Sequence, residues 1–145
     1  MRRLTLVALL LSASCSDFPH DPEGTLDRVR ADGAFRVGIV ARGAPVTAQE
    51  QLFLQQVARA ANARPQIEHA ASESLLARLE EGELDLVLGE FDAASPWLKR
   101  VTFIPPLSAR SAEGDAAIVS AVARNGENAW IRLLHAEKAV LESAR

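Results

Sequence analysis

The sequence predicts an α/β domain, built as a single three-layer lobe around a mostly parallel sheet. Three short β-rich runs, at 35–40, 66–69 and 84–88, alternate with two amphipathic helical stretches through short connections. Alternation of this kind favours parallel strands joined by right-handed crossovers. The chain has 145 residues, 48% of them hydrophobic and 24% charged, which is enough for one domain with a buried core. We expect the strand at 35–40 to lie between the other two.

Local signals define the first half of the domain, from residue 25 onward. Residues 25–33 form a short helix that ends at Gly33. Thr47 and Glu50 have the spacing of a capping box, which predicts that a helix begins there and ends before Pro65. The inward stripe of this helix is predicted to contain Leu52, Phe53, Val57 and Ala60 or Ala61.

The second half continues the same alternation. Ser72 begins a helix that Gly82 ends, and its inward residues are Leu75, Leu76 and Leu79. Residues 101–107 form a short extended piece, and the apolar run 116–123 is expected to join the same sheet. A closing helix over 128–142 buries the residues at helical spacing, namely Trp130, Leu133, Leu134 and Leu141.

The first 24 residues are predicted to lie outside the folded lobe of residues 25–145. Arg2 and Arg3 precede a short apolar stretch and then small residues, which is typical of a secretory signal over 1–14. The stretch "LLLSASC" resembles a bacterial lipoprotein signal, in which Cys15, the only cysteine, becomes the lipidated N-terminus. Residues 15–24 would then tether the domain to the periplasmic face of a bacterial membrane. An ordinary export signal with an incidental cysteine is the alternative.

Strand order places the candidate ligand site. In open α/β sheets, ligands lie beyond the carboxyl ends of the strands, where the strand order reverses. Two loops, after Val40 and after Leu88, meet that condition. On the first loop, Arg42 is a candidate contact for an anion near a helix start, with plain solvent exposure as the alternative.

The second loop carries the other candidates. Gly89, Glu90 and Phe91 are expected to lie on it, and Glu90 either accepts a ligand ammonium group or is ordinary surface. Trp97, further along, either forms an apolar wall of the site or fills the space where a ligand would go. Lys99 and Arg100 are interpreted as a solvated pair.

Several classes of function lack support in the sequence. The formal net charge is −3, so no broad basic surface indicates a nucleic-acid partner. His20, His69 and His135 have no partners at metal-ligand spacing, and neither a nucleophile motif nor a phosphate-binding glycine loop is present. We therefore expect no enzyme activity, no catalytic residues, no bound metal and no cofactor.

Three segments together resemble the family 3 periplasmic solute-binding proteins of bacterial ABC transporters. They are "TLDRVRADGAFRVGIV", "LEEGELDLVLGEFDAASPWLKRVTFIPP" and "NGENAWIRLLHAEKAVL". Asp85 matches the structural Asp of the family's "G-x-x-D" run. Members of the family have two lobes, and the second is inserted where this chain has only residues 108–115. The resemblance implies one lobe of that fold.

The resemblance also implies a function. It predicts the substrate-binding component of a transporter for amino acids or similar small solutes, with an ABC permease, or a second copy facing its open cleft, as partner. The alternative is a degenerate lobe that acts as a tethered interaction or sensory module. Amino-acid-binding members place an Arg six residues before the Phe of their "V-x-F" segment, and counting back from Phe103 gives Trp97. An indole cannot neutralise a carboxylate, so we expect an apolar, aromatic or cationic ligand rather than a free α-amino acid.

Changing Cys15 to Ser tests the lipid anchor. Without the thiol no lipid can be attached, so the Cys15→Ser variant should move from the membrane fraction to the soluble fraction. Fractionation followed by N-terminal sequencing of the wild type provides the measurement. A wild-type chain that is already soluble and begins at another residue would contradict lipidation.

Overall fold

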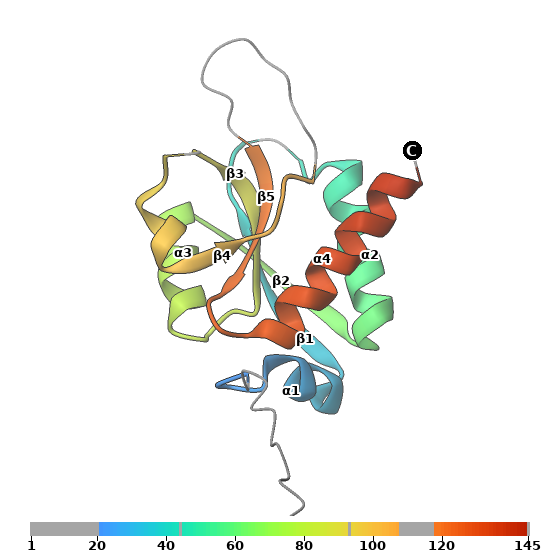
Figure 1. Cartoon of the computed structure of the whole chain (residues 1–145). Coiled ribbons are helices and arrows are strands. Elements are labelled where there is room, and N and C mark those ends of the chain that lie inside the picture. The colour runs from blue at the N-terminus through green and yellow to red at the C-terminus, as the bar shows by residue number, and fades with distance from the viewer. Residues whose placement is uncertain (1–20, 44, 93, 108–117, 145) are drawn as a thin grey trace, which may run out of the picture.

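The computed structural model describes residues 21–43, 45–92, 94–107 and 118–144, with the side chain of residue 118 left out. In chain order, the elements are α1 (Thr25–Asp32), β1 (Ala34–Val40), α2 (Ala48–Ala61), β2 (Arg64–Ala70), α3 (Ser72–Glu80), β3 (Leu86–Phe91), the 3-10 helix η1 (Pro96–Lys99), β4 (Val101–Phe103), β5 (Ile118–Arg124) and α4 (Asn128–Ser143). The predicted order of helices and strands is confirmed (Figure 1).

The strands form one mixed sheet in the order β2-β1-β3-β5-β4. β1 pairs in parallel with β2 on one side and with β3 on the other, as predicted for the strand at 35–40. β5 pairs antiparallel with both β3 and β4, so the parallel part of the sheet is confined to its first three strands. The apolar run expected to join this sheet does so over residues 118–124.

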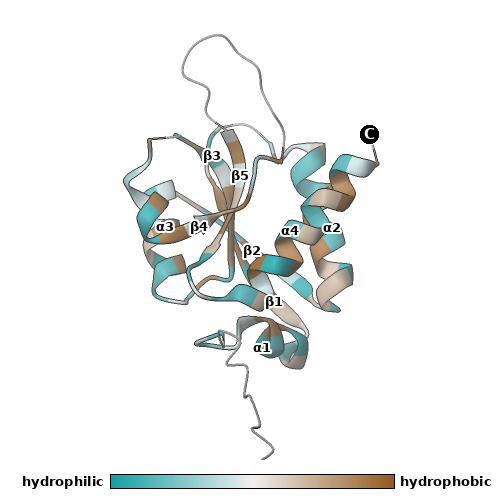
Figure 2. Ribbon diagram, viewed as in Figure 1, coloured by the Kyte–Doolittle hydropathy of each residue, from teal (hydrophilic) through white to brown (hydrophobic). Residues whose placement is uncertain are grey.

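Helices cover both faces of the sheet, which gives the three predicted layers. α3 lies on one face, whereas α2 and α4 lie on the other, and α1 sits below the sheet at the start of β1 (Figure 1). Each face has its own apolar cluster, one containing Trp130 and Phe53 and the other containing Leu75 and Trp97. Hydrophobic residues concentrate on the strands and on the inner sides of the helices (Figure 2).

The first part of β3 is buried on both faces, which explains its run of apolar residues from Leu86 to Leu88. Leu86 and Leu88 pack in the cluster under α2 and α4, whereas Val87 and Phe91 pack in the cluster under α3. The two-residue period of a strand produces this division. A strand with only one buried face would have alternated apolar and polar residues instead.

The start of α2 was predicted correctly, but its buried stripe was not. Thr47 and Glu50 form a full capping box. Leu52, however, is 50% exposed, and Leu54 is buried in its place beside Phe53. Both assignments fit helical spacing, and the contact between α2 and α4 selects the second. The helix ends at Asn62, whose φ of 51° is left-handed.

Asp85 is a buried charged residue that joins several elements. Its side chain is only 2% exposed and receives hydrogen bonds from the side chains of Arg28 and Arg36 and, at 2.8 Å, from the backbone N–H of Arg36. Its own carbonyl oxygen accepts a hydrogen bond from the indole N–H of Trp130 at 2.7 Å. Asp85 therefore connects β3 to α1, β1 and α4, in agreement with the structural role that the resemblance implies.

The last residues of the predicted tether are packed against the domain, which corrects the boundary at residue 24. The carboxylate of Asp21 accepts hydrogen bonds from the backbone N–H of Ala129 at 2.9 and 3.0 Å. The backbone N–H groups of Glu23 and Thr25 donate to the carboxylate of Glu127. The first turn of a helix has unpaired N–H donors, and Asp21 satisfies one of those in α4.

The predicted signal at 1–14, with Cys15 and His20, lies outside the described residues. Within the described ranges, no helix combines the length and apolar character needed to cross a membrane.

Replacing Asp85 with Asn should destabilise the domain by about 3 kcal/mol, because the change leaves two arginines without their buried counter-charge. Asp32→Asn is the matched control: Asp32 also faces Arg28, at 3.8 Å, but its side chain is 59% exposed. The control should cost less than about 1 kcal/mol. Urea unfolding at neutral pH measures both free energies of unfolding. Equal losses in the two variants would contradict the role assigned to Asp85.

Candidate ligand-binding site

An apolar cavity of about 280 Å³ opens where β3 ends. Its apolar lining residues come from the end of β3, from η1 and from β4 with the segment that follows: Phe91, Leu98, Phe103, Ile104, Pro105 and Pro106. Asp92 and Ser120 supply the polar part of the lining. The cavity therefore lies at the carboxyl end of β3, the end at which ligands bind in open α/β sheets, but on the side of β5 and β4 rather than between β1 and β3, where the strand order reverses.

Long-range pairing holds the walls of this cavity in place. Phe91 and Phe103 meet edge to face, with ring centroids 5.4 Å apart and planes at 87°. Behind them, the backbone N–H of Ile104 donates to the carbonyl of Ala121 at 2.8 Å, which attaches the segment after β4 to β5. Leu98 is 49% exposed at the rim. The cavity thus has a rigid aromatic wall and an accessible aliphatic edge.

Gly89, Glu90 and Phe91 were predicted to lie on a loop, but they form the last part of β3. β5 pairs with all three, which extends the strand beyond Leu88. Gly89 is required by packing, since a Cβ atom there would lie 2.4 Å from Cγ2 of Val40. Only Phe91 of the three lines the cavity.

Arg42 is not exposed as one interpretation of the sequence suggested, because it forms an ion pair with a buried carboxylate. The Arg42 side chain is 12% exposed and that of Glu50 is fully buried. Two hydrogen bonds join them, from Nη1 to Oε1 at 2.9 Å and from Nη2 to Oε2 at 2.6 Å. The guanidinium is therefore already neutralised and has little capacity for a ligand anion.

This ion pair and the capping box together determine the charge state of Glu50. Burial alone would raise the pKa of the Glu50 carboxyl, but hydrogen bonds from Arg42 and Thr47 outweigh burial, and the pKa is lowered. The hydrogen bond to Glu50 is the main reason that the pKa of Arg42 is raised, and the charge of Glu90 adds to it. Glu90 thus acts on Arg42, on the face of the sheet opposite Phe91.

Trp97 fills space in the core beside the cavity. Its side chain is 7% exposed, packs in the cluster under α3 and donates its indole N–H to Oε2 of Glu73 at 2.8 Å. The guanidinium of Arg100 lies 4.4 Å from the ring centroid, and Arg100 also pairs with Glu80. Arg100 and Lys99 are both exposed, as expected of solvated residues, and Arg100 in addition contacts Trp97 and Glu80.

The structure brings together a different set of residues from the one predicted. Arg42, Gly89, Glu90 and Trp97 surround the carboxyl end of the sheet without lining the cavity. Sequence reasoning missed the other lining residues, namely Asp92, Leu98, Phe103, Ile104, Pro105, Pro106 and Ser120. The apolar residues that flank Lys99 and Arg100 were the available signal for Leu98 and Phe103, whereas Ser120 is placed only by strand pairing.

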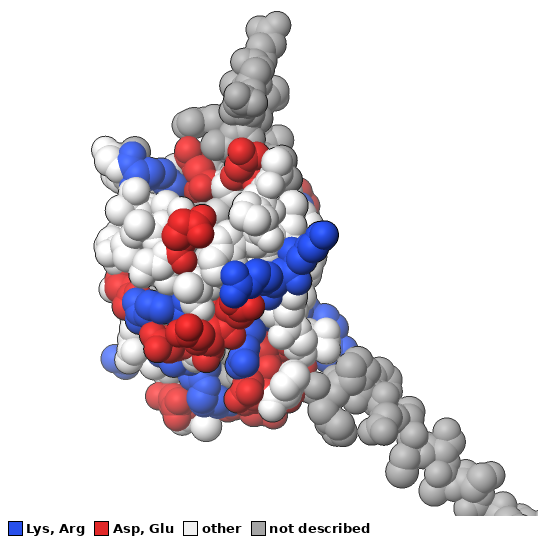
Figure 3. Space-filling view, turned by 90° about the vertical axis from the view of Figure 1, so that its left-hand side faces the viewer, with Lys and Arg blue, Asp and Glu red and all other residues white. Residues whose placement is uncertain are grey.

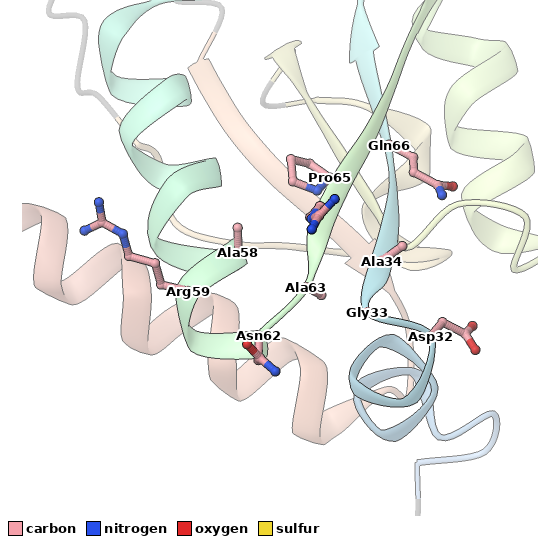
Figure 4. A pocket seen from close by; sticks show the side chains of 10 residues that line it. Asp32, Gly33, Ala34, Ala58, Arg59, Asn62, Ala63, Pro65 and Gln66 are labelled. Atoms are coloured by element: carbon pink, nitrogen blue, oxygen red, sulfur yellow. The ribbon is translucent and has the colours of Figure 1, made fainter.

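A larger hollow, of about 920 Å³, lies at the other end of the sheet. The starts of β1 and β2 and the ends of α1 and α2 line this open hollow, with Asp32, Arg59 and Asn62 among its residues (Figure 4). This hollow therefore lies at the amino ends of the strands, whereas ligands in open α/β sheets bind at the carboxyl ends. On the face that α3 covers, acidic and basic side chains are interleaved (Figure 3). Within the described part of the chain, no group of three or more His, Cys, Asp and Glu could hold a metal ion.

Solved structures share this fold. The arginine-bound form of domain 1 from TmArgBP superposes with a TM-score of 0.65 at 15% identity, over 79% of this chain and 98% of that one. A Streptococcus pneumoniae amino acid ABC transporter substrate-binding protein bound to L-arginine gives 0.65 at 10% identity, over 83% and 92%. An ancestral cationic amino acid solute binding protein gives 0.63 at 10% identity, over 83% and 94%.

The resemblance seen in the sequence is thus supported at the level of the fold, which is that of one lobe of these binding proteins. No protein-family model matches the sequence, and a comparison with curated proteins finds no match.

Acid should destabilise the domain partly through Glu50. Because its pKa is lowered in the folded state, the Glu50 carboxylate stabilises the fold at neutral pH, and this contribution is lost as the pH falls below 4.5, the ordinary value, and through the lower folded value. The Glu50→Gln variant should be less stable at neutral pH and lose less stability on acidification. Thermal unfolding between about pH 7 and about pH 3 measures both effects.

Glu81→Gln, a change at an exposed carboxylate, is the control and should keep the wild-type dependence on pH. If Glu50→Gln and wild type lose stability in parallel below pH 4.5, some other carboxylate dominates the acid response.

Proposed function

We propose that this domain binds a small solute in the apolar cavity at the end of β3, as the ligand-binding component of an ABC transporter. The single observation that carries the proposal is the position of the cavity, beyond the carboxyl end of a central strand in a binding-protein fold. The proteins of similar fold are binding proteins for amino acids, including arginine. Their similarity supports the class of function and leaves the choice of ligand to this chain's own residues.

A single lobe is compatible with binding, although the affinity should be modest. The cavity volume of about 280 Å³ lies near the lower end of the range for small-molecule sites, about 300 to 1,000 Å³. A single lobe contacts only one side of a ligand and leaves much of the ligand exposed to solvent. Because less ligand surface is buried, the binding free energy is smaller. The arginine-bound form of domain 1 from TmArgBP supports the idea that one such lobe can hold a small ligand by itself.

The rest of the transport assignment is part of the same proposal. The chain would be exported, attached through a lipid on Cys15, and would pass its solute to a membrane permease. The lipoprotein-like stretch "LLLSASC" supports the anchor. A tethered interaction or sensory module is the competing function, and it predicts that the cavity binds no solute.

Thermal-shift screening of the purified domain against amino acids, amines and small organic acids tests the proposal, because a ligand of the native state raises its melting temperature. The Leu98→Ser variant removes an aliphatic contact at the rim and should weaken binding about tenfold. Leu52→Ser is the matched control: Leu52 is 50% exposed against 49% for Leu98, and it lies on α2 outside the cavity lining.

Two results would contradict solute binding at this site. The first is the absence of any stabilising solute in the screen, which favours the interaction module. The second is a ligand whose affinity falls equally in the Leu98 and Leu52 variants, which places binding elsewhere on the domain.

A further inference from the structure

We infer that the solute is an organic cation without a carboxylate: an amine or guanidinium group on a short apolar body. The inference rests on the proposed function and concerns the same cavity. It follows from the charges around the cavity and from the chemistry of the cavity walls.

The charged group in the described lining of the cavity is an acid. Asp92 is exposed at the rim, and its Oδ1 accepts a hydrogen bond from the backbone N–H of Ala94 at 2.7 Å. Among the described residues, none donates to its second oxygen, Oδ2. An amine or guanidinium can donate a hydrogen bond to that oxygen and supply the opposite charge.

Arg42 and Arg100 are already paired, so they are poor partners for a ligand carboxylate. Arg42 is held by the buried Glu50, and Arg100 pairs with Glu80 while lying over the ring of Trp97. Releasing Arg42 would leave Glu50 as an unpaired charge in the interior, which is strongly unfavourable. Lys99 is exposed and directly follows Leu98, but it does not line the cavity.

The walls also suit a cation on an apolar stem. Phe91 and Phe103 offer aromatic surface, whose faces attract ammonium and guanidinium groups. Leu98 and the prolines can cover methylene groups, and the Ser120 hydroxyl adds one polar contact. A carboxylate in this cavity would meet apolar walls and the like charge of Asp92, and both penalise it.

Two probes that differ only in the carboxylate test the inference. Agmatine is arginine without its carboxylate, so the pair isolates that group. We expect calorimetry to show that agmatine binds about tenfold or more tightly than arginine. The Asp92→Asn variant, which keeps the shape of the side chain, should lose at least about tenfold in affinity for agmatine. Asp27→Asn, at an exposed acid on α1, should leave that affinity unchanged.

The outcomes separate this inference from the proposed function. Arginine binding as tightly as agmatine, with a loss on Lys99→Gln, would overturn the inference while solute binding stands. Binding of neutral or anionic solutes alone would do the same. If no solute binds, the proposed function fails and the inference with it. Agmatine preference that disappears on Asp92→Asn and persists on Asp27→Asn would establish the ligand class.

Discussion

The buried carboxylate of Asp85 joins α1 and β1 to the start of β3. A lone charge inside a protein is costly, and two arginines together with one backbone N–H compensate for it here. Those donors belong to α1 and β1, while the same residue's carbonyl holds Trp130 of α4. Helices α1 and α4 and the first part of β1 are thereby fixed to the start of β3. The cavity at the far end of β3 inherits its geometry from that arrangement.

An arginine paired with a buried acid is found both near the start of β1 and just after its end. Arg36, within the strand, pairs with Asp85, and Arg42, just after it, pairs with Glu50 at the start of α2. Both arginines are therefore already neutralised by buried acids in the folded domain. Asp92 follows β3 directly and keeps its charge exposed at the cavity rim. The negative charge at the cavity rim thus depends on which charged groups the fold pairs internally, rather than on the net charge of the chain.

Periodicity and capping signals were sufficient to predict the fold, because the elements carry their own local signatures: the capping box at Thr47 and the stretch of apolar residues in β3 are examples. The candidate site was harder, since nonlocal pairing decides it. Gly89 suggested the end of a strand, but β5 pairs beyond it and turns an expected loop into a wall. Likewise, Leu52 and Leu54 fit the helical stripe equally well until α4 is in place. A single sequence does not show which strand or helix will pack against these positions.

The hydrogen bonds that Asp21 accepts from the first turn of α4 have a geometric consequence. They hold the beginning of the folded domain beside α1, at the end of the sheet opposite the cavity (Figure 1). Any attachment upstream of Asp21 is therefore connected to the domain at that end. The six residue steps between Cys15 and Asp21 span at most about 20 Å. If Cys15 carries the attachment proposed above, the cavity opens on the side of the domain that faces away from that attachment.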